Sequence, residues 1–297
     1  NMIYLDDFFP TFVPFGHAVF YNTIDEIPTG VSIIGKTFYD GDHATHREVI
    51  QTLLPKTDKL ILVFVEAVEE YFAKFIQELT DPKITVIINA VTNMPTTAES
   101  AIAWFMCPNN FYNMSSGNRW LLTLVDRLSH EQYKPKYFDC LLGREKYHRT
   151  QIEKFYNSSS HKDKILFSYF KQESNMTDGI WDLDVTGIPS TATSIGEYDV
   201  PLSSILPVSI YNQSYYSVVA ETTCYNSHNQ YTEKLAKPIV ARRLFVAFAS
   251  QHYLANLKQL GFKTFDSIID ESYDTVADLD TRLKLAWSQV EWLCEQD

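Results

Sequence analysis

The segment between residues 216 and 260 constrains the fold most, because short apolar runs alternate in it with segments of helical character. Residues 216–220 and 244–249 are apolar and rich in β-branched or aromatic side chains, which is typical of buried strands. Thr232 can cap a helix between them, and residues 251–260 carry leucines at helical spacing. This alternation favours a parallel sheet with crossover helices.

Five polar residues stand where the first of these strands ends and the next helix begins: Glu221, Thr222, Thr232, Glu233 and Lys234. In parallel sheets, ligands bind outside the carboxyl ends of the strands. The helix start offers backbone N–H groups and a positive dipole to an anion, and Lys234 adds a point charge suited to a diphosphate. Glu233 can accept hydrogen bonds from a ribose or sugar hydroxyl. The pattern indicates a nucleotide-diphosphate site; a capped first turn that binds nothing is the alternative.

Three motifs in this half of the chain resemble the C-terminal half of GT-B-type, Leloir glycosyltransferases, in particular a group found in bacteria and their viruses. They are T-E-K-x-x-K-P-I from Thr232, L-x-x-L-G-F-K-T-F from Leu257 and D-E-S-Y-D from Asp270. The first is also similar to the T-E-K segment of fucosyltransferases. The resemblance covers roughly residues 137–280 and is tightest over the last third of that range.

The resemblance implies a two-domain architecture and specific roles for the T-E-K segment. In such enzymes the Glu contacts the ribose or sugar of the donor and the Lys contacts its phosphates. These roles fall on Glu233 and Lys234, with Glu221 as a second donor contact. The implied architecture is α/β, with two Rossmann-like domains facing a cleft. The acidic turn at residues 270–274 is predicted to be exposed, and it could cap a helix near Leu279.

A second group of candidate residues follows the strand predicted at residues 137–142. That strand ends at Gly143 and Arg144, and a helix carrying Arg149 begins near Lys146. Backbone N–H groups at a helix start and a forked guanidinium can converge on one phosphate, so Arg144 and Arg149 are candidates for the donor phosphates. The resembling family often has an Arg and a His-Arg pair at this place. A solvent-exposed helix residue is the alternative for Arg149.

The chain is long enough for two domains with cores of their own, since it has 297 residues of which 45% are hydrophobic. A polar, proline-containing break separates an N-terminal acceptor-side α/β domain, residues 1–132, from a C-terminal nucleotide-sugar-binding α/β domain, residues 133–297. The first domain also alternates helical segments with strand-like runs, which lie at residues 31–38, 60–65 and 84–91. This alternation favours α/β layers there as well.

Charge and cysteine usage narrow the classes of function. The formal net charge of −12 disfavours a general nucleic-acid-binding protein, which needs a basic face. The four cysteines lack the spacing of a zinc site and fit a reducing compartment, and Cys140 is predicted to be a small buried side chain. The sequence shows no signal peptide and no long apolar run, so we expect a cytoplasmic protein without a transmembrane segment.

Acidic residues also stand near strand ends in the first domain, where an acceptor lies in two-domain transferases. An inverting transfer needs a carboxylate or a histidine to take the proton of the acceptor hydroxyl. The candidate catalytic residues are therefore Asp42, His43 and Glu66. Asp6, after the first predicted strand, is a further acid of this kind. The alternatives are an ordinary turn for Asp42 and a helix-start pair for His43 and His46, since two histidines alone do not indicate a metal site.

These patterns together indicate transfer of a sugar from a nucleotide-sugar donor to a hydroxyl acceptor. Cationic groups would stabilise the departing nucleoside diphosphate, so neither a metal ion nor a further cofactor is required. The expected acceptor is a glycan or another hydroxyl compound; modified viral DNA fits the charge less well. The alternative from another class is a catalytically silent binding or assembly protein that has kept the same scaffold.

Overall fold

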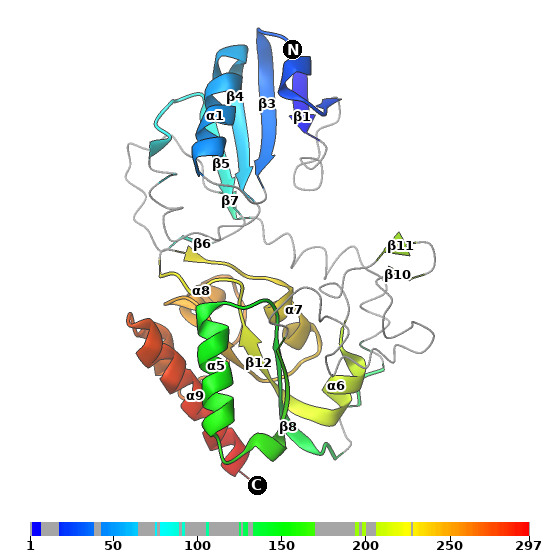
Figure 1. Ribbon diagram of the computed structural model, residues 1–297, viewed down its shortest axis with the longest axis vertical. Helices are drawn as coiled ribbons and strands as arrows, with labels where there is room; N and C mark the ends of the chain where they lie inside the picture. The colour runs from blue at the N-terminus through cyan, green and yellow to red at the C-terminus, as the bar shows by residue number, and fades with distance from the viewer. Residues whose placement is uncertain are drawn as a thin grey trace. The chain divides into compact units, whose positions relative to one another are not determined.

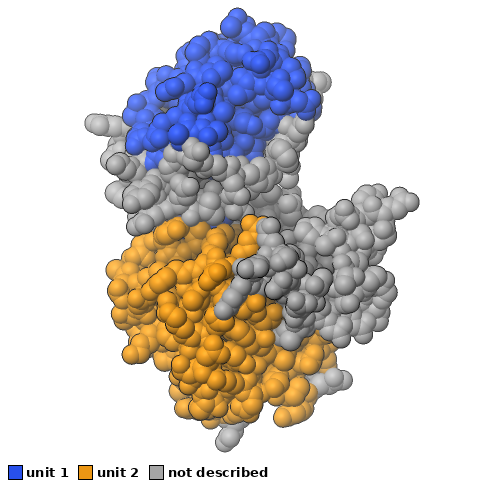
Figure 2. All heavy atoms as spheres, in the orientation of Figure 1, with its two compact units in different colours: residues 1–109, 227–230 blue, residues 110–226, 231–297 orange. Residues whose placement is uncertain are grey.

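The computed structural model describes residues 2–6, 18–38, 43–64, 75, 78–88, 91–92, 105–106, 125, 127–129, 133–169, 194–195, 198–199, 206–226 and 228–296. The chain divides into two compact units, coloured separately in Figure 2: unit 1 is residues 1–109 with 227–230, and unit 2 is residues 110–226 with 231–297. Each unit is an α/β structure built on a parallel sheet, as the sequence predicts. The boundary at residue 132 stays a prediction, because few residues around it are described.

The sheet of unit 1 has the strand order β2-β1-β3-β4-β5-β7, and every neighbouring pair is parallel. Its strands are β1 (Ile3–Asp6), β2 (Val19–Tyr21), β3 (Val31–Phe38), β4 (Thr57–Phe64), β5 (Ile84–Ile88) and β7 (Phe105–Met106). The helix α1 (His43–Leu53) connects β3 to β4 (Figure 1). The other elements described in unit 1 are η2 (Ile24–Glu26), η3 (Leu54–Lys56) and the antiparallel pair β6 (Val91–Thr92) and β13 (His228–Asn229).

Apolar side chains of β3 and β4 form the centre of the core of unit 1. Val31, Ile34, Leu60 and Leu62 have no exposed surface, because the strands of a parallel sheet are covered on both faces. The three strands predicted from apolar runs in this half are confirmed as β3, β4 and β5. The bounds of β3 agree with the prediction, and β4 begins earlier than predicted, at Thr57.

The sheet of unit 2 has the strand order β14-β12-β8-β9, again with parallel neighbours. Its strands are β8 (Lys136–Leu142), β9 (Ile165–Tyr169), β12 (Ser214–Ala220) and β14 (Phe245–Phe248). Its helices are α5 (Tyr147–Ser158), α6 (Val208–Gln213), α7 (Glu233–Val240), α8 (Tyr253–Gln259), α9 (Leu279–Glu295), η5 (Lys162–Lys164) and η8 (Glu271–Thr275). A separate antiparallel pair comprises β10 (Ser194–Ile195) and β11 (Tyr198–Asp199). The predicted order of strand, helix, strand and helix is confirmed by β12, α7, β14 and α8.

Local chemistry explains where α7 begins and ends. Thr232 caps the helix, and its side chain accepts a hydrogen bond from the Lys234 N–H, as the sequence predicts. The helix ends in a Schellman motif, in which the Arg243 N–H bonds to the Pro238 carbonyl and Arg242 takes a left-handed φ of 53°. Glycine is the usual residue at such a position, so Arg242 holds a backbone conformation that costs about 1 kcal/mol.

The helix α9 packs beside α5 on the sheet of unit 2 (Figure 1). Its Trp287 ring stacks on Phe155 of α5 with centroids 6.0 Å apart, and it contacts Phe248 of β14 at 6.3 Å. None of the described helices, α9 included, is long and apolar enough to cross a membrane.

Candidate functional site

Glu221 organises the carboxyl edge of the sheet in unit 2. It follows β12 directly and has no exposed surface. Its Oε1 accepts from the Thr232 N–H (3.1 Å) and the Tyr253 hydroxyl (2.7 Å), and its Oε2 accepts from the Thr222 N–H (3.1 Å) and the Thr232 hydroxyl (2.6 Å). These bonds occupy the acceptor capacity of the carboxylate. The geometry thus gives Glu221 a positioning role at the start of α7, in place of the direct donor contact that the resemblance implies.

Most backbone N–H groups in the first turn of α7 already donate hydrogen bonds to the capping residue, Thr232. The Lys234 N–H donates to Thr232 Oγ1 at 3.3 Å, and the N–H groups of Leu235 and Ala236 donate to the Thr232 carbonyl. The helix start therefore offers fewer backbone donors to an anion than its sequence predicts. The positive charge at this place comes from the end of the helix dipole together with Lys234.

Lys234 folds back over this capped turn and does not extend into bulk solvent. Its Nζ lies 2.7 Å from Glu233 Oε1, 3.3 Å from Thr222 Oγ1 and 3.4 Å from Thr232 Oγ1, and 27% of its side chain is exposed. Burial would raise the pKa of the Glu233 carboxyl, but the nearby lysine charges outweigh it and lower that pKa. The result is a partly exposed ion pair between Lys234 and Glu233.

Lys237 is a further cation that sequence reasoning did not assign to the site. It is buried within α7, and burial lowers its pKa to about 8, with Lys234 acting in the same direction and Glu233 against it. A buried cation beside Lys234 raises the local positive potential and thus favours an anion. The sequence could have pointed to Lys237, since it is the second lysine of the K-x-x-K motif that begins at Lys234.

Arg149 connects the loop after β8 to the same edge. Its guanidinium donates from Nη1 to the Arg144 carbonyl (2.8 Å) and from Nη2 to the Glu221 carbonyl (3.2 Å). Gly143 leaves room for it, since a Cβ at that position would lie 3.3 Å from Nη1. Only 3% of Arg149 is exposed, so the alternative of a solvent-exposed helix residue is wrong, and the guanidinium holds two loops together. The exposed side chain of Arg144 stays a candidate for phosphate contact.

Lys146 and His148 complete the edge, although the sequence assigned no role to either. Lys146 Nζ donates to the Thr222 carbonyl at 2.9 Å, and His148 Nε2 lies 2.8 Å from the Glu221 carbonyl. Because a carbonyl only accepts, His148 Nε2 carries the hydrogen. Burial lowers the pKa of His148 to about 3, and the charges of Arg149 and Lys146 act in the same direction. The imidazole is therefore a neutral structural donor that leaves the positive charge to the lysines.

Most of the predicted binding residues are joined in one hydrogen-bonded network, and Arg144 is joined to it through its carbonyl. We call this the carboxyl-edge network; its members are Lys146, His148, Arg149, Glu221, Thr222, Thr232, Glu233 and Lys234.

The candidate catalytic residues of the first half stay predictions. Asp42 and Glu66 lie outside the described residues. His43 is described only by its backbone, at the start of α1.

Two neighbours of these candidates have structural roles. The His46 ring lies in the first turn of α1 and packs on Phe38 with centroids 4.5 Å apart. The Asp6 carboxylate accepts the Thr37 N–H at 2.6 Å and Lys36 Nζ at 3.0 Å. Asp6 is thus engaged within its own sheet.

The acidic turn differs from its prediction. Asp274 is 5% exposed, and its carboxylate accepts the N–H groups of Leu254 (2.9 Å) and Ala255 (3.0 Å) at the start of α8. Asp278 is the residue that caps α9, through the Thr281 N–H at 2.8 Å. The prediction of an exposed turn is therefore wrong for Asp274. Its carboxylate is buried by hydrogen bonds to α8, and the local sequence does not reveal that contact.

Cysteines and metal ligands add little to the site. Cys140, Cys224 and Cys294 are free and buried, and the burial of Cys140 confirms its prediction. In the part of the chain that the structure describes, no three His, Cys, Asp or Glu side chains gather as a metal-binding group.

Comparison with known proteins returned no match: no family model, no curated protein and no solved structure is similar to the chain. A functional assignment therefore depends on the sequence motifs and on the geometry of the carboxyl-edge network.

Proposed function

We propose that the chain is a nucleotide-sugar-dependent glycosyltransferase whose donor diphosphate binds at the carboxyl edge of unit 2. The observation that carries the proposal is the position of Lys234. Its ammonium lies at the start of α7, held 3.3 Å from Thr222 Oγ1 on a turn that the buried Glu221 fixes. A fixed cation at a helix start, outside the carboxyl ends of parallel strands, is suited to a phosphate group.

The chemistry supplied by this edge is electrostatic. When a diphosphate binds, the Lys234 ammonium exchanges part of its contact with Glu233 for a phosphate oxygen, and Glu233 becomes available to a ribose or sugar hydroxyl. Lys237 and Arg144 add positive charge around the departing nucleoside diphosphate, which stabilises the charge that develops during transfer.

The proposal extends to a GT-B-like arrangement in which unit 1 holds the acceptor. Asp42, His43 and Glu66 are the candidates for the group that takes the proton of the acceptor hydroxyl. The acceptor class is a glycan or another hydroxyl compound.

Calorimetric titration of the full chain with nucleoside diphosphates tests the donor site. We expect saturable binding that weakens at least tenfold in Lys234→Ala, since a charge-assisted hydrogen bond contributes about 1.5–3 kcal/mol. Glu233→Ala should weaken binding of the nucleotide sugar more than binding of the nucleoside diphosphate. Lys284→Ala, which removes one exposed lysine from α9, is the matched control for charge. Absence of binding by the unaltered chain, or equal affinity in Lys234→Ala, contradicts the proposal.

The second candidate is a non-catalytic binding or assembly protein on the same scaffold. The engagement of Asp6 by Thr37 and Lys36 favours it, because that carboxylate is then unavailable as a base. Slow hydrolysis of the nucleotide sugar to nucleoside diphosphate separates the two candidates. A transferase releases nucleoside diphosphate above the uncatalysed rate, whereas a binding protein that passes the titration releases none.

A further inference from the structure

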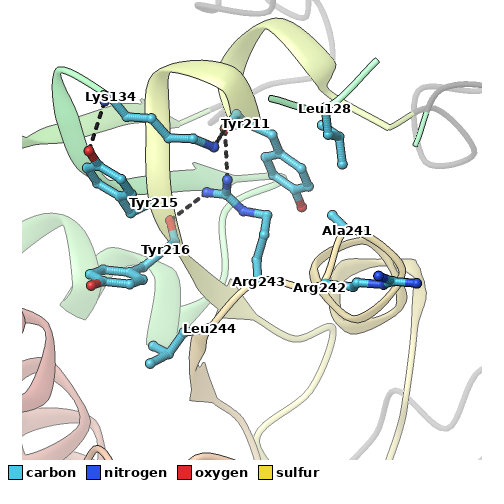
Figure 3. A pocket seen from close by; sticks show the side chains of 9 residues that line it. All are labelled: Leu128, Lys134, Tyr211, Tyr215, Tyr216, Ala241, Arg242, Arg243 and Leu244. Carbon is cyan, nitrogen blue, oxygen red and sulfur yellow. Dashed lines mark hydrogen bonds between the residues drawn. The ribbon is translucent and has the colours of Figure 1, made fainter. Parts of the chain in front are cut away.

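A pocket opens at the amino edge of the same sheet, opposite the carboxyl-edge network (Figure 3). It has a volume of about 210 Å³ and lies where β8, β12 and β14 begin. The residues that matter for its chemistry are Lys134, Tyr211, Tyr215, Tyr216, Arg242 and Arg243. We call it the amino-edge pocket.

Arg243, which lines the pocket, forms a buried ion pair with Asp139 behind it. Arg243 Nη2 lies 2.7 Å from Asp139 Oδ2, and both side chains are buried. The other nitrogens of Arg243 donate to Ser217 and to the carbonyls of Tyr211 and Ser214. Arg243 is therefore occupied within the fold, and it contributes charge to the pocket but no free donor.

The Lys134 ammonium has more N–H donors than the described residues use. It is 6% exposed, and among the described residues the Tyr211 carbonyl, at 2.6 Å, is the one hydrogen-bond acceptor of its ammonium. An ammonium has three N–H donors, and a buried polar group is normally bonded. Figure 3 shows the ammonium beside the Tyr211 carbonyl, which it shares with the Arg243 guanidinium. Two donors are thus left for a ligand in the pocket.

Arg242 supplies a second cation. Its side chain is exposed, and no hydrogen bond or ion pair joins it to the described residues. Its left-handed backbone sets the side chain at the turn that lines the pocket, where glycine would be the unstrained residue. Three cations and one carboxylate, Asp139, leave this region at a charge of +2, in a chain whose net charge is −12.

The size and walls limit the ligand. A volume of 210 Å³ is below the range of about 300–1,000 Å³ that is usual for drug-sized ligands, so a nucleotide sugar is too large. A phosphate group fits, and the rings of Tyr215 and Tyr216, which are only partly buried, can contact a small organic group attached to it.

We propose that the amino-edge pocket is an anion-binding site, separate from the donor site, that takes a phosphate group as the free anion or as the monoester of a small molecule. The spare donors of Lys134 and the guanidinium of Arg242 bind the phosphate oxygens. The buried pair of Arg243 and Asp139 holds this wall of the pocket in place.

Titration of inorganic phosphate into the full chain carrying Lys234→Ala tests the site, because that substitution removes the main cation of the donor site. We expect saturable binding that weakens at least tenfold when Arg242→Gly is added and stays within about threefold when Arg242→Lys is added. The glycine variant should fold at least as well, since glycine adopts a φ of 53° without strain. A melting temperature that does not fall, together with lost phosphate binding, separates a binding role from a structural one.

Two further measurements complete the test. A small sugar phosphate that binds more tightly than inorganic phosphate identifies the monoester as the ligand, and the reverse order identifies the free anion. Lys134→Met should also weaken phosphate binding at least tenfold. Absence of saturable phosphate binding, or equal affinity in Arg242→Gly, overturns the proposal. Because nucleoside diphosphate binding by Arg242→Gly should be unchanged, failure here leaves the donor-site proposal standing.

Discussion

The two edges of the sheet in unit 2 each contain a buried carboxylate, but the carboxylates are held in different ways. At the carboxyl edge, Glu221 accepts four bonds from neutral hydroxyl and amide donors. At the amino edge, Asp139 pairs with the guanidinium of Arg243 and accepts two serine hydroxyls. Burial raises the pKa of Asp139, and the Arg243 charge acts against that rise.

This difference determines which cationic side chains remain available at each edge of the sheet. Because neutral donors stabilise the Glu221 carboxylate, no cation is needed beside it, and Lys234 stays partly exposed in an ion pair with Glu233. At the amino edge, Asp139 forms an ion pair with the guanidinium of Arg243. Two further cations, Lys134 and Arg242, line the pocket there. The same sheet therefore presents one cationic site at each end.

The largest effect is expected from Arg243→Ala. The substitution leaves Asp139 buried without its cation, which costs about 3–5 kcal/mol of unfolding free energy. Urea denaturation measures the loss, with Arg242→Ala as a control that should change stability by less than about 1 kcal/mol. Equal losses in the two variants would show that the buried pair does not organise the amino edge.

The next largest effect is expected at low pH, where protonation of His148 should lower the unfolding free energy of the chain. The folded pKa of His148 is lowered to about 3, against an ordinary value of 6.5, so the unfolded chain binds the proton first as pH falls. The stability present above pH 6.5 is therefore lost between about pH 6.5 and pH 3, by roughly 3–5 kcal/mol. Denaturation midpoints measured across this range in the unaltered chain and in His148→Gln should differ in slope, and parallel profiles would contradict the prediction.

Glu221→Gln should cost about 2–3 kcal/mol. In either orientation the amide NH₂ would face a backbone N–H, that of Thr222 or that of Thr232, which now donates to a carboxylate oxygen. Glu233→Gln, on the partly exposed ion pair, is the matched control and should cost less than about 1 kcal/mol. A smaller loss in Glu221→Gln than in Glu233→Gln would reverse the roles assigned to the two glutamates.

Thr232→Ala should have the smallest effect, about 1–2 kcal/mol. It removes the cap of α7 and one of the donors to Glu221. Thr232→Ser keeps the hydroxyl and should stay within about 0.5 kcal/mol of the unaltered chain. Chemical denaturation of both variants checks this, and equal losses would show that the methyl group, not the cap, stabilises the helix.

The local sequence pattern predicts best the elements that contain apolar runs. The strands β3, β12 and β14 and the cap at Thr232 followed from local hydrophobicity and side-chain chemistry. Asp274 did not follow, because its partners in α8 lie twenty residues away in sequence and its own neighbours are polar. Periodicity reports which face is apolar, and it does not report which carboxylate meets which distant N–H group.

The candidate site shows the same division. The sequence placed Thr222, Glu233 and Lys234 at one edge, and the structure joins them. It also suggested solvent or ligand as the partner of Arg149 and Glu221, whereas each is buried and bonded within the fold. The Asp139–Arg243 pair spans 104 residues, and its only local signal is an aspartate within an apolar strand.

By itself, the sequence determined the α/β class, the positions of the main strands in unit 2 and the residues gathered at the carboxyl edge, because these depend on local hydrophobicity and on the common direction of parallel strands. The tertiary structure alone decided which charged groups are buried and which remain available to a ligand. That outcome depends on desolvation and on hydrogen-bond partners from distant parts of the chain, as Glu221 and Lys134 show at opposite edges of one sheet.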